Sequence, residues 1–172
     1  DVSSGDWGGI YVGPTSSASI DHAVIAYGGG TTRIEGGFAD FNAVEVRQGD
    51  LRLTNSTIEN NAAGSSTSTV ADRAGRGSNA AGTVYVLGSQ PVIAGNKIQS
   101  NEGAAININA NSLNYEIVSD LGRSRGAIDR VESIGNHGPL ITGNRLASNQ
   151  TNGMVVRGGV MTTEGVWDDT DI

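Results

Sequence analysis

Hydrophobic and polar residues alternate along this chain in short runs of three to five positions, with Gly and Asn between the runs. Successive side chains of a β-strand point to opposite faces, so a period of two is typical of strands and not of helices. Residues 113–134 are the one candidate for an amphipathic helix. The pattern therefore predicts an all-β protein. The clearest strand runs are "GIYVG" at 9–13, "AVEVR" at 43–47, "TVYVL" at 83–87, "AININ" at 105–109 and "MVVRG" at 154–158.

A longer phrase recurs between these runs. "PVIAGNKIQSN" starts at Pro91 and "PLITGNRLASN" at Pro139, and looser versions are "SIDHAVIAYGG" and "LRLTNSTIENN". Repetition of this kind is the sequence signature of a solenoid, in which successive units stack on one another. Each phrase holds two apolar residues five positions apart, namely Ile20 and Ile25, Leu53 and Ile58, Ile93 and Ile98, and Ile141 and Leu146. Three residues after each pair come Gly28, Asn61, Asn101 and Asn149.

The length of the repeat indicates which solenoid to expect. The shortest step between equivalent strand positions, from Val86 to Ile108, is 22 residues. Longer steps carry their extra residues in three segments that we interpret as loop insertions, at 28–41, 62–82 and 110–137. Short strands, turns at fixed positions and this step predict a parallel β-helix with about five to six coils. We expect it to form a single domain over residues 1–172.

Equivalent positions of successive coils lie above one another in such a fold, at the interstrand spacing of roughly 4.8 Å. We therefore expect one internal stack of Ile20, Leu53, Ile93 and Ile141, and a second of Ile25, Ile58, Ile98 and Leu146. Asn61, Asn101 and Asn149 are expected at a sharp turn, because Asn tolerates left-handed backbone and its amide can bond the amides of neighbouring coils. Gly28 is expected to fill the same turn position in the first coil, for the same backbone reason.

Particular segments carry a family resemblance. "GDWGGIYVG" followed by "IDHAVIAYGG" resembles the right-handed parallel β-helix superfamily, which has the pectate-lyase-like fold. The closing "EGVWDDTDI" resembles segments of large bacterial extracellular β-helix proteins. The resemblance implies a right-handed coil and an extracellular or cell-surface protein with a structural or adhesive role. Because the same fold also serves polysaccharide lyases and glycoside hydrolases, a carbohydrate-active fragment is the alternative.

Charge and composition exclude several other classes. The chain has 172 residues, a net charge of −7 and no Cys. The acidic balance argues against nucleic acid and anionic membrane surfaces as partners, and no apolar run approaches the roughly 20 residues of a membrane-spanning helix. Without Cys the chain has neither disulfides nor a thiolate metal site.

Two groups of residues are candidates for a catalytic role. Asp21 and His22 resemble the Ile-Asp-His of pectate lyases, yet they occupy the ordinary turn phrase of the repeat. Glu45 and Arg47 stand on a strand run whose neighbours in other coils are Tyr11, Tyr85 and Asn107, so no carboxylate cluster is expected there. Glycoside hydrolysis needs two carboxylates that converge on one bond. We expect no catalytic residue and no turnover of acidic polysaccharides.

Two further groups of residues are candidates for ligand or glycan chemistry. Asp168, Asp169 and Asp171 could offer oxygen ligands to calcium, with a polar turn after a strand as the alternative reading. No other cofactor is expected. Asn55-Ser-Thr is a formal glycosylation sequon.

The two ends of the solenoid bear on its partners. Trp7, Ile10 and Val12 at one end and Val155 and Val156 at the other would expose apolar surface and strand edges if nothing covered them. We expect further β-helix to cover them, from the same polypeptide or from copies stacked head-to-tail. Carbohydrate is the other ligand class that the resemblance allows.

Overall fold

The computed structural model describes residues 1–35, 37–64, 76–123 and 128–165. These residues contain no α-helix, so the prediction of an all-β chain is confirmed and the candidate helix at 113–134 is wrong wherever it is described. The helical element among them is the 3-10 turn Ala110–Ser112. The strands are β1 (Ile10–Val12), β2 (Ser17–Asp21), β3 (Val24–Ala26), β4 (Gly30–Ile34), β5 (Gly37–Phe41), β6 (Val44–Arg47), β7 (Asp50–Thr54), β8 (Thr57–Glu59), β9 (Val84–Leu87), β10 (Val92–Ala94), β11 (Lys97–Gln99), β12 (Ala104–Asn109), β13 (Leu140–Thr142), β14 (Arg145–Ala147) and β15 (Thr151–Arg157).

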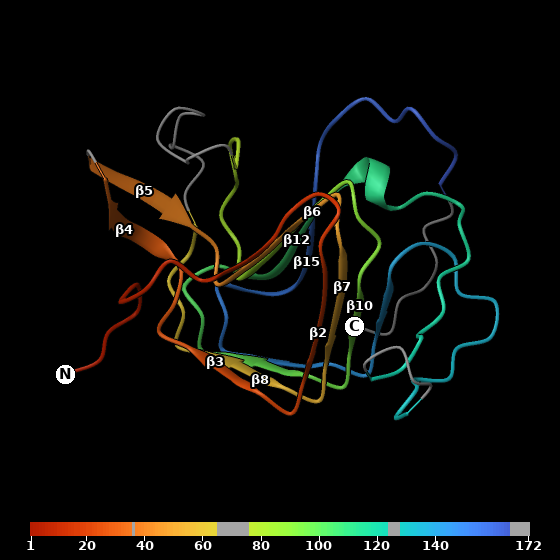
Figure 1. The fold of residues 1–172 in the computed structure, drawn as a ribbon, viewed down its shortest axis with the longest axis horizontal. Coiled ribbons are helices and arrows are strands. Elements are labelled where there is room, and N and C mark those ends of the chain that lie inside the picture. The colour runs from red at the N-terminus through yellow and green to blue at the C-terminus, as the bar shows by residue number, and fades with distance from the viewer. Residues whose placement is uncertain (36, 65–75, 124–127, 166–172) are drawn as a thin grey trace.

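Three parallel sheets contain all of these strands except β4 and β5. Sheet 1 has the order β1-β6-β9-β12-β15, sheet 2 the order β2-β7-β10-β13 and sheet 3 the order β3-β8-β11-β14. Within the described residues the chain passes through sheets 1, 2 and 3 in that order four times, and β15 then returns to sheet 1. Figure 1 shows the strands of each sheet one behind another, with the three sheets facing a common interior. This topology of stacked parallel sheets is compatible with a β-solenoid.

The pairing registers align the repeated phrases. In sheet 2, Leu53 is the register partner of both Ile20 and Ile93, and Ile93 also pairs with Ile141. The same relation holds in sheet 3, where Ile58 pairs with Ile25 and Ile98, and Ile98 with Leu146. Equivalent apolar residues of the four phrases therefore lie in two columns.

The columns point into the interior. Leu53, Ile58, Ile93 and Ile98 are fully buried, and they share one apolar cluster with Val residues of sheet 1. Ile20 of the first pass and Leu146 of the last pass are only partly buried, whereas Ile25 and Ile141 of the same passes are buried. Burial of these side chains on successive passes is the main source of stability that the fold offers.

The three insertions differ in structure. Residues 28–41 contain β4 and β5, which pair as an antiparallel hairpin that projects away from the three sheets in Figure 1. Residues 62–82 connect β8 to β9. Residues 110–137 connect β12 to β13, and we call their segment 113–136 the strap, because its described parts lie over the outer face of sheet 2. No helix among the described residues is long and apolar enough to cross a membrane.

Candidate functional site

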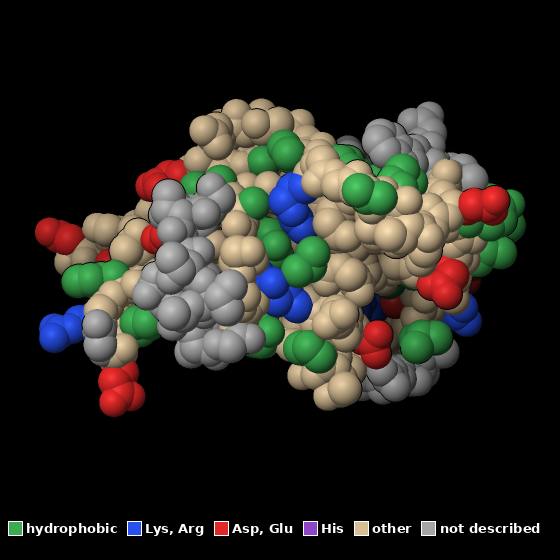
Figure 2. Space-filling model, turned by 90° about the horizontal axis from the view of Figure 1, so that it is seen from above, with side chains coloured by type: hydrophobic (Ala, Val, Ile, Leu, Met, Phe, Trp, Pro, Cys, Tyr) green, Lys and Arg blue, Asp and Glu red, His purple; other side chains and the backbone are tan. Residues whose placement is uncertain are grey.

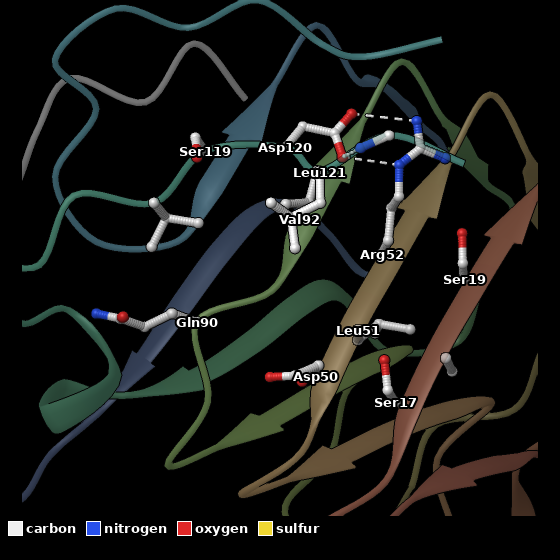
Figure 3. A pocket seen from close by; sticks show the side chains of 13 residues that line it. Ser17, Ser19, Asp50, Leu51, Arg52, Gln90, Val92, Ser119, Asp120 and Leu121 are labelled. Atoms are coloured by element: carbon white, nitrogen blue, oxygen red, sulfur yellow. Dashed lines mark hydrogen bonds and ion pairs between the residues drawn. The ribbon is translucent and has the colours of Figure 1, made fainter. Parts of the chain in front are cut away.

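A cavity of about 220 Å³ lies between the strap and the outer face of sheet 2. Figure 3 shows Ser17 and Ser19 entering it from β2, and Asp50 and Arg52 from β7, while Asp120 of the strap faces them. A second cavity of about 330 Å³ adjoins the first and shares Asp50, Gln90 and Val118 with it. Hydroxyl, amide and charged side chains line both cavities, and apolar side chains such as Leu51 and Val92 line the first as well. We call the two cavities together the polar groove.

The strongest interaction in the groove joins Arg52 to Asp120. Arg52 Nε donates to Asp120 Oδ1 at 2.8 Å and Arg52 Nη2 donates to Oδ2 at 3.1 Å. The backbone N–H groups of Gly122 and Val131 donate to the same carboxylate. The guanidinium also donates to the backbone oxygen of Asp129. This buried, bidentate pair fastens the strap to β7.

The charge state of Asp120 follows from these bonds. Burial alone raises the pKa of this carboxyl, but hydrogen bonds from Arg52, Val131 and Gly122 outweigh burial and hold the pKa below its usual value. A carboxylate that is held ionised and accepts four hydrogen bonds is a poor general acid. Asp120 therefore has the surroundings of a fastening residue.

We predict that Asp120→Asn destabilises the protein by about 3 kcal/mol at pH 7, because the substitution leaves Arg52 buried without its counter-charge. The folded-state pKa of Asp120 is lowered, so its stabilising contribution is complete above the unfolded pKa of about 3.9 and is lost as the pH falls from there through the folded pKa. The difference between wild type and variant should shrink as urea unfolding is repeated from pH 7 down to pH 3.

The comparison variant is Arg123→Ala, which removes a half-exposed guanidinium and its ion pairs with Asp129 and, at 3.3 Å, with Asp21 Oδ2. It should cost less than about 1 kcal/mol, because exposed pairs are weakened by solvent. An Asp120→Asn effect that is equally small, or that does not change with pH, would contradict the assignment of the Arg52 pair as the fastening of the strap.

Asp21 and His22 lie beside this pair at the end of β2. His22 Nδ1 is 2.7 Å from Asp21 Oδ2, and Thr54 Oγ1 and Asn55 Nδ2 donate to Asp21 Oδ1. Burial raises the pKa of Asp21, but the bonds from Thr54, His22 and Asn55 outweigh it and hold the pKa well below its usual range. The His22 ring is largely exposed. The pair is therefore an oriented imidazole next to an ionised carboxylate.

The backbone at His22 accounts for its position without catalysis. His22 has a φ of +52°, and the next passes have φ of +49° at Asn55, +66° at Gly95 and +63° at Gly143. All four residues follow a strand of sheet 2, and Asp21 pairs in register with Thr54. The turn between sheets 2 and 3 thus needs left-handed backbone at this point in every pass. Asn55 is exposed, but its Nδ2 is engaged with Asp21.

The described residues form no candidate metal-binding site. Residues 1–35, 37–64, 76–123 and 128–165 contain no group of three or more His, Asp or Glu side chains that could hold a metal ion. The calcium candidates Asp168, Asp169 and Asp171 lie outside the described residues.

The outer face of sheet 1 carries the row of neighbouring residues that the repeat predicts, namely Tyr11, Glu45, Tyr85 and Asn107. Glu45 pairs in register with Tyr11 and Tyr85, and Tyr85 pairs with Asn107. Glu45 is fully buried and accepts a hydrogen bond from Arg47. A second carboxylate does not join Glu45 among the described members of this row, so the pair needed for glycoside hydrolysis is not formed there.

Arg157 completes this face. Its guanidinium lies 4.1 Å from the centre of the Tyr85 ring, and Arg47 lies 5.1 Å from the same centre. Arg157 donates to oxygens of Asn107 and Val86, and burial lowers its pKa. Figure 2 shows basic side chains among hydrophobic ones near the middle of the face seen from above. The Tyr85 ring thus carries two stacked guanidinium groups.

Buried amides form a column at the turn after sheet 3. Asn61 donates its backbone N–H at 3.0 Å and its Nδ2 at 2.9 Å to Asn101 Oδ1. Asn101 makes the same two bonds to Asn149 Oδ1, and Asn149 makes them to Asn152 Oδ1. Gly28 N–H donates to Asn61 Oδ1 at the other end. We call this set the first amide ladder.

The backbone reason given for these Asn residues is wrong. Asn61, Asn101, Asn149 and Gly28 do not have positive φ. The left-handed position is the residue before each of them, with φ of +61° at Tyr27, +55° at Asn60, and +56° at both Ser100 and Ser148. The Asn side chain is needed for its amide, which also bonds a strand carbonyl of the preceding pass, as Asn101 Nδ2 does with Ile58 O at 3.0 Å.

A second amide ladder stands at the turn after sheet 2, and sequence reasoning missed it. Asn96 donates its backbone N–H and its Nδ2 to Asn144 Oδ1, each at 3.0 Å. Ser56 N–H donates to Asn96 Oδ1, and Ala23 N–H donates to Ser56 Oγ. The signal was the Asn of "AGNK" and "TGNR", which stands two residues before the second apolar position of each phrase.

The N-terminal residues cover part of the first strand edge. Trp7 pairs with Gly28 in a parallel bridge, and its indole Nε1 donates to Ala26 O at 2.8 Å. Gly5 N–H donates to Tyr27 O at 3.0 Å. Trp7 therefore lies against the edge that follows β3, while 37% of its own surface stays exposed.

Comparisons with known proteins give no relative from which a function could be transferred. No family model, no curated protein and no solved structure matches this chain.

Proposed function

We propose that this chain is a right-handed parallel β-helix module of an extracellular or cell-surface protein, and that its role is structural or adhesive. Its coils are about 22 residues long apart from the insertions. Further β-helix extends it beyond the described passes. The right-handed coil and the extracellular location rest on the resemblance of "GDWGGIYVG" and "IDHAVIAYGG" to the β-helix superfamily.

The proposed structural role is supported chiefly by the hydrogen bonds of the buried polar groups, which join one pass to the next. Asn61, Asn96 and Asn101 are almost fully buried, and each of them bonds the passes on both sides of it. The buried Arg52–Asp120 pair fastens the strap. Buried polar groups that only bond one another hold a scaffold together, whereas a catalytic site needs groups that reach a substrate.

An adhesive role is supported by the surface of the strap. Several of its large apolar side chains are exposed, and such surface is typical of regions that contact other molecules. They are Tyr115, Ile117, Leu121, Ile128 and Ile134.

A carbohydrate-binding role is the second candidate, and the polar groove over sheet 2 favours it. Hydroxyl and amide side chains such as Ser17, Ser19 and Gln90 line the two adjoining cavities. Side chains of these types bond sugar hydroxyls, and a groove between a strap and a sheet suits a chain of sugar residues.

The experiment that separates scaffold from enzyme is a turnover assay. Purified protein incubated with polygalacturonate, with and without calcium, should release no unsaturated oligosaccharide, because hydrogen bonds from the protein itself occupy the oxygens of Asp21 and Asp120, the two buried carboxylates near His22. Absorbance of the unsaturated product measures the outcome. Calcium-dependent release that disappears in His22→Ala or Asp21→Ala, while His137→Ala remains active, would contradict the proposed function.

A further inference from the structure

The two amide ladders have a direction. In the rungs formed by Asn61, Asn96 and Asn101, the backbone N–H and one Nδ2 hydrogen donate to the side-chain oxygen of the next pass along the chain. The other Nδ2 hydrogen donates back to a strand carbonyl of the preceding pass. A rung that carries Asn therefore needs an oxygen from the pass that follows it.

The first pass has no side-chain oxygen at its two rung positions that could accept hydrogen bonds from a preceding pass. Its rung positions are Ala23 and Gly28, which donate their N–H groups at 3.1 and 2.8 Å and carry no side-chain acceptor. Trp7 also lies over Gly28, where an added Cβ would come within 2.9 Å of the indole. At this edge, which we call the N-terminal edge, both ladders begin.

The two ladders end differently at the opposite edge, which is formed by β13, β14 and β15. The first ladder is closed within the chain, because Asn152 Oδ1 accepts both hydrogen bonds from Asn149, at 2.9 and 3.0 Å. The second ladder ends at Asn144, whose Nδ2 donates to Ile93 O at 2.8 Å. We call this edge the C-terminal edge.

Asn144 has hydrogen-bond donors that no described residue accepts. It is 9% exposed, and among the described residues its backbone N–H and its second Nδ2 hydrogen have no acceptor. The equivalent atoms of Asn96 both reach an oxygen of the next pass. Beside it, Leu146 is only partly buried, whereas Ile58 and Ile98 of the same column are fully buried. Within the part of the chain that the structure describes, two donors without an acceptor and a partly buried apolar residue thus lie at the same edge.

We propose that the C-terminal edge binds one further β-helix pass whose residue above Asn144 carries a side-chain oxygen, and that the N-terminal edge binds none. This inference rests on the proposed function and adds a direction and a recognition chemistry to it. A second copy of this chain does not fit in register, because it would set the methyl group of Ala23 above Asn144. Two buried donors would then stay unpaired, at about 1–3 kcal/mol each. The partner is therefore a pass with Asn, Asp or Ser at this rung, and copies do not stack head-to-tail.

The test adds a pass to the full chain. A copy of residues 91–103, which holds Asn96 and Asn101, is fused after Ile172 through a Gly-Ser linker that supplies a millimolar effective concentration. Amide hydrogen exchange at Asn144 and along Arg145–Ala147 should slow by about tenfold or more. The matched control carries Asn96→Ala in the added copy alone and should lose most of this protection at Asn144.

The second arm addresses direction. The same copy fused before Asp1 should leave exchange along Val24–Ala26 unchanged, and the unmodified chain should sediment as a monomer across a concentration series. Protection at β3, equal protection by the Asn96→Ala copy, no protection by either copy, or concentration-dependent filaments would each overturn the proposal. Turnover of polygalacturonate would overturn the proposed function and leave these exchange results unaffected, so the two failures are distinguishable.

Discussion

Ile98→Asp should abolish the folded state. Ile98 is fully buried between Ile58 and Leu146, its register partners in the sheet 3 column. A carboxylate at this position would be buried without a partner, which costs several kcal/mol beyond the lost apolar burial. The sum is comparable to the whole stability of an ordinary domain, about 5–15 kcal/mol. Far-ultraviolet circular dichroism and urea unfolding measure the loss.

The matched control is Lys97→Asp, one residue earlier on β11. Lys97 is exposed, so the same new charge meets water and should change stability by less than about 1 kcal/mol. If Ile98→Asp left the unfolding midpoint unchanged, or if the two variants behaved alike, the interior column would be misassigned.

Asn101→Ala should have the second-largest effect, a loss of about 3 kcal/mol or more. The substitution removes the acceptor of two donors on Asn61 and the donor to Ile58 O, all at buried sites. Each buried group left unpaired costs about 1–3 kcal/mol. Urea unfolding measures the total, and hydrogen exchange at Asn61 should speed up locally.

Asn152→Ala provides the comparison at the end of the same ladder. Asn152→Ala removes the oxygen that accepts two hydrogen bonds from Asn149, just as Asn101→Ala removes the acceptor of Asn61. Asn152 is exposed, however, so water can replace the lost oxygen. The expected loss is about 1 kcal/mol or less. Equal losses for the two variants would show that burial of the ladder is not what makes Asn101 important.

The equivalent residues of the repeat could be predicted from the sequence, because stacking requires the same kind of residue at the same position of every pass. Ile93 and Ile98 recur five positions apart since each must fill the interior once per pass, and that spacing survives the insertions of different length. The same logic placed Asn101 at a turn. The predicted backbone conformation of Asn101 was wrong, because a sequence does not reveal whether Asn or the residue before it, here Ser100, has the left-handed backbone.

The polar groove could not be predicted in the same way. Arg52 and Asp120 are 68 residues apart, and they meet because the strap folds back over sheet 2. The strap does not repeat, so no internal comparison gives its path, and its apolar residues resembled one face of a helix. The cover that Trp7 gives to Gly28 was missed for a related reason. It depends on residues that precede the first repeat and belong to no column.

Disulfide formation between introduced Cys residues would show whether the repeated phrases stack in parallel and in register. The chain has no Cys, so Lys97→Cys/Arg145→Cys has only the introduced pair, on exposed register partners of β11 and β14. Neighbouring strands lie about 4.8 Å apart, within the range that a disulfide can bridge. Lys97→Cys/Ala147→Cys moves one partner two residues along the strand, to a diagonal of roughly 8 Å that exceeds this range. Mild oxidation should link the first pair and not the second. Linkage of the second pair alone, or of neither pair, would mean that β11 and β14 do not stack in this register.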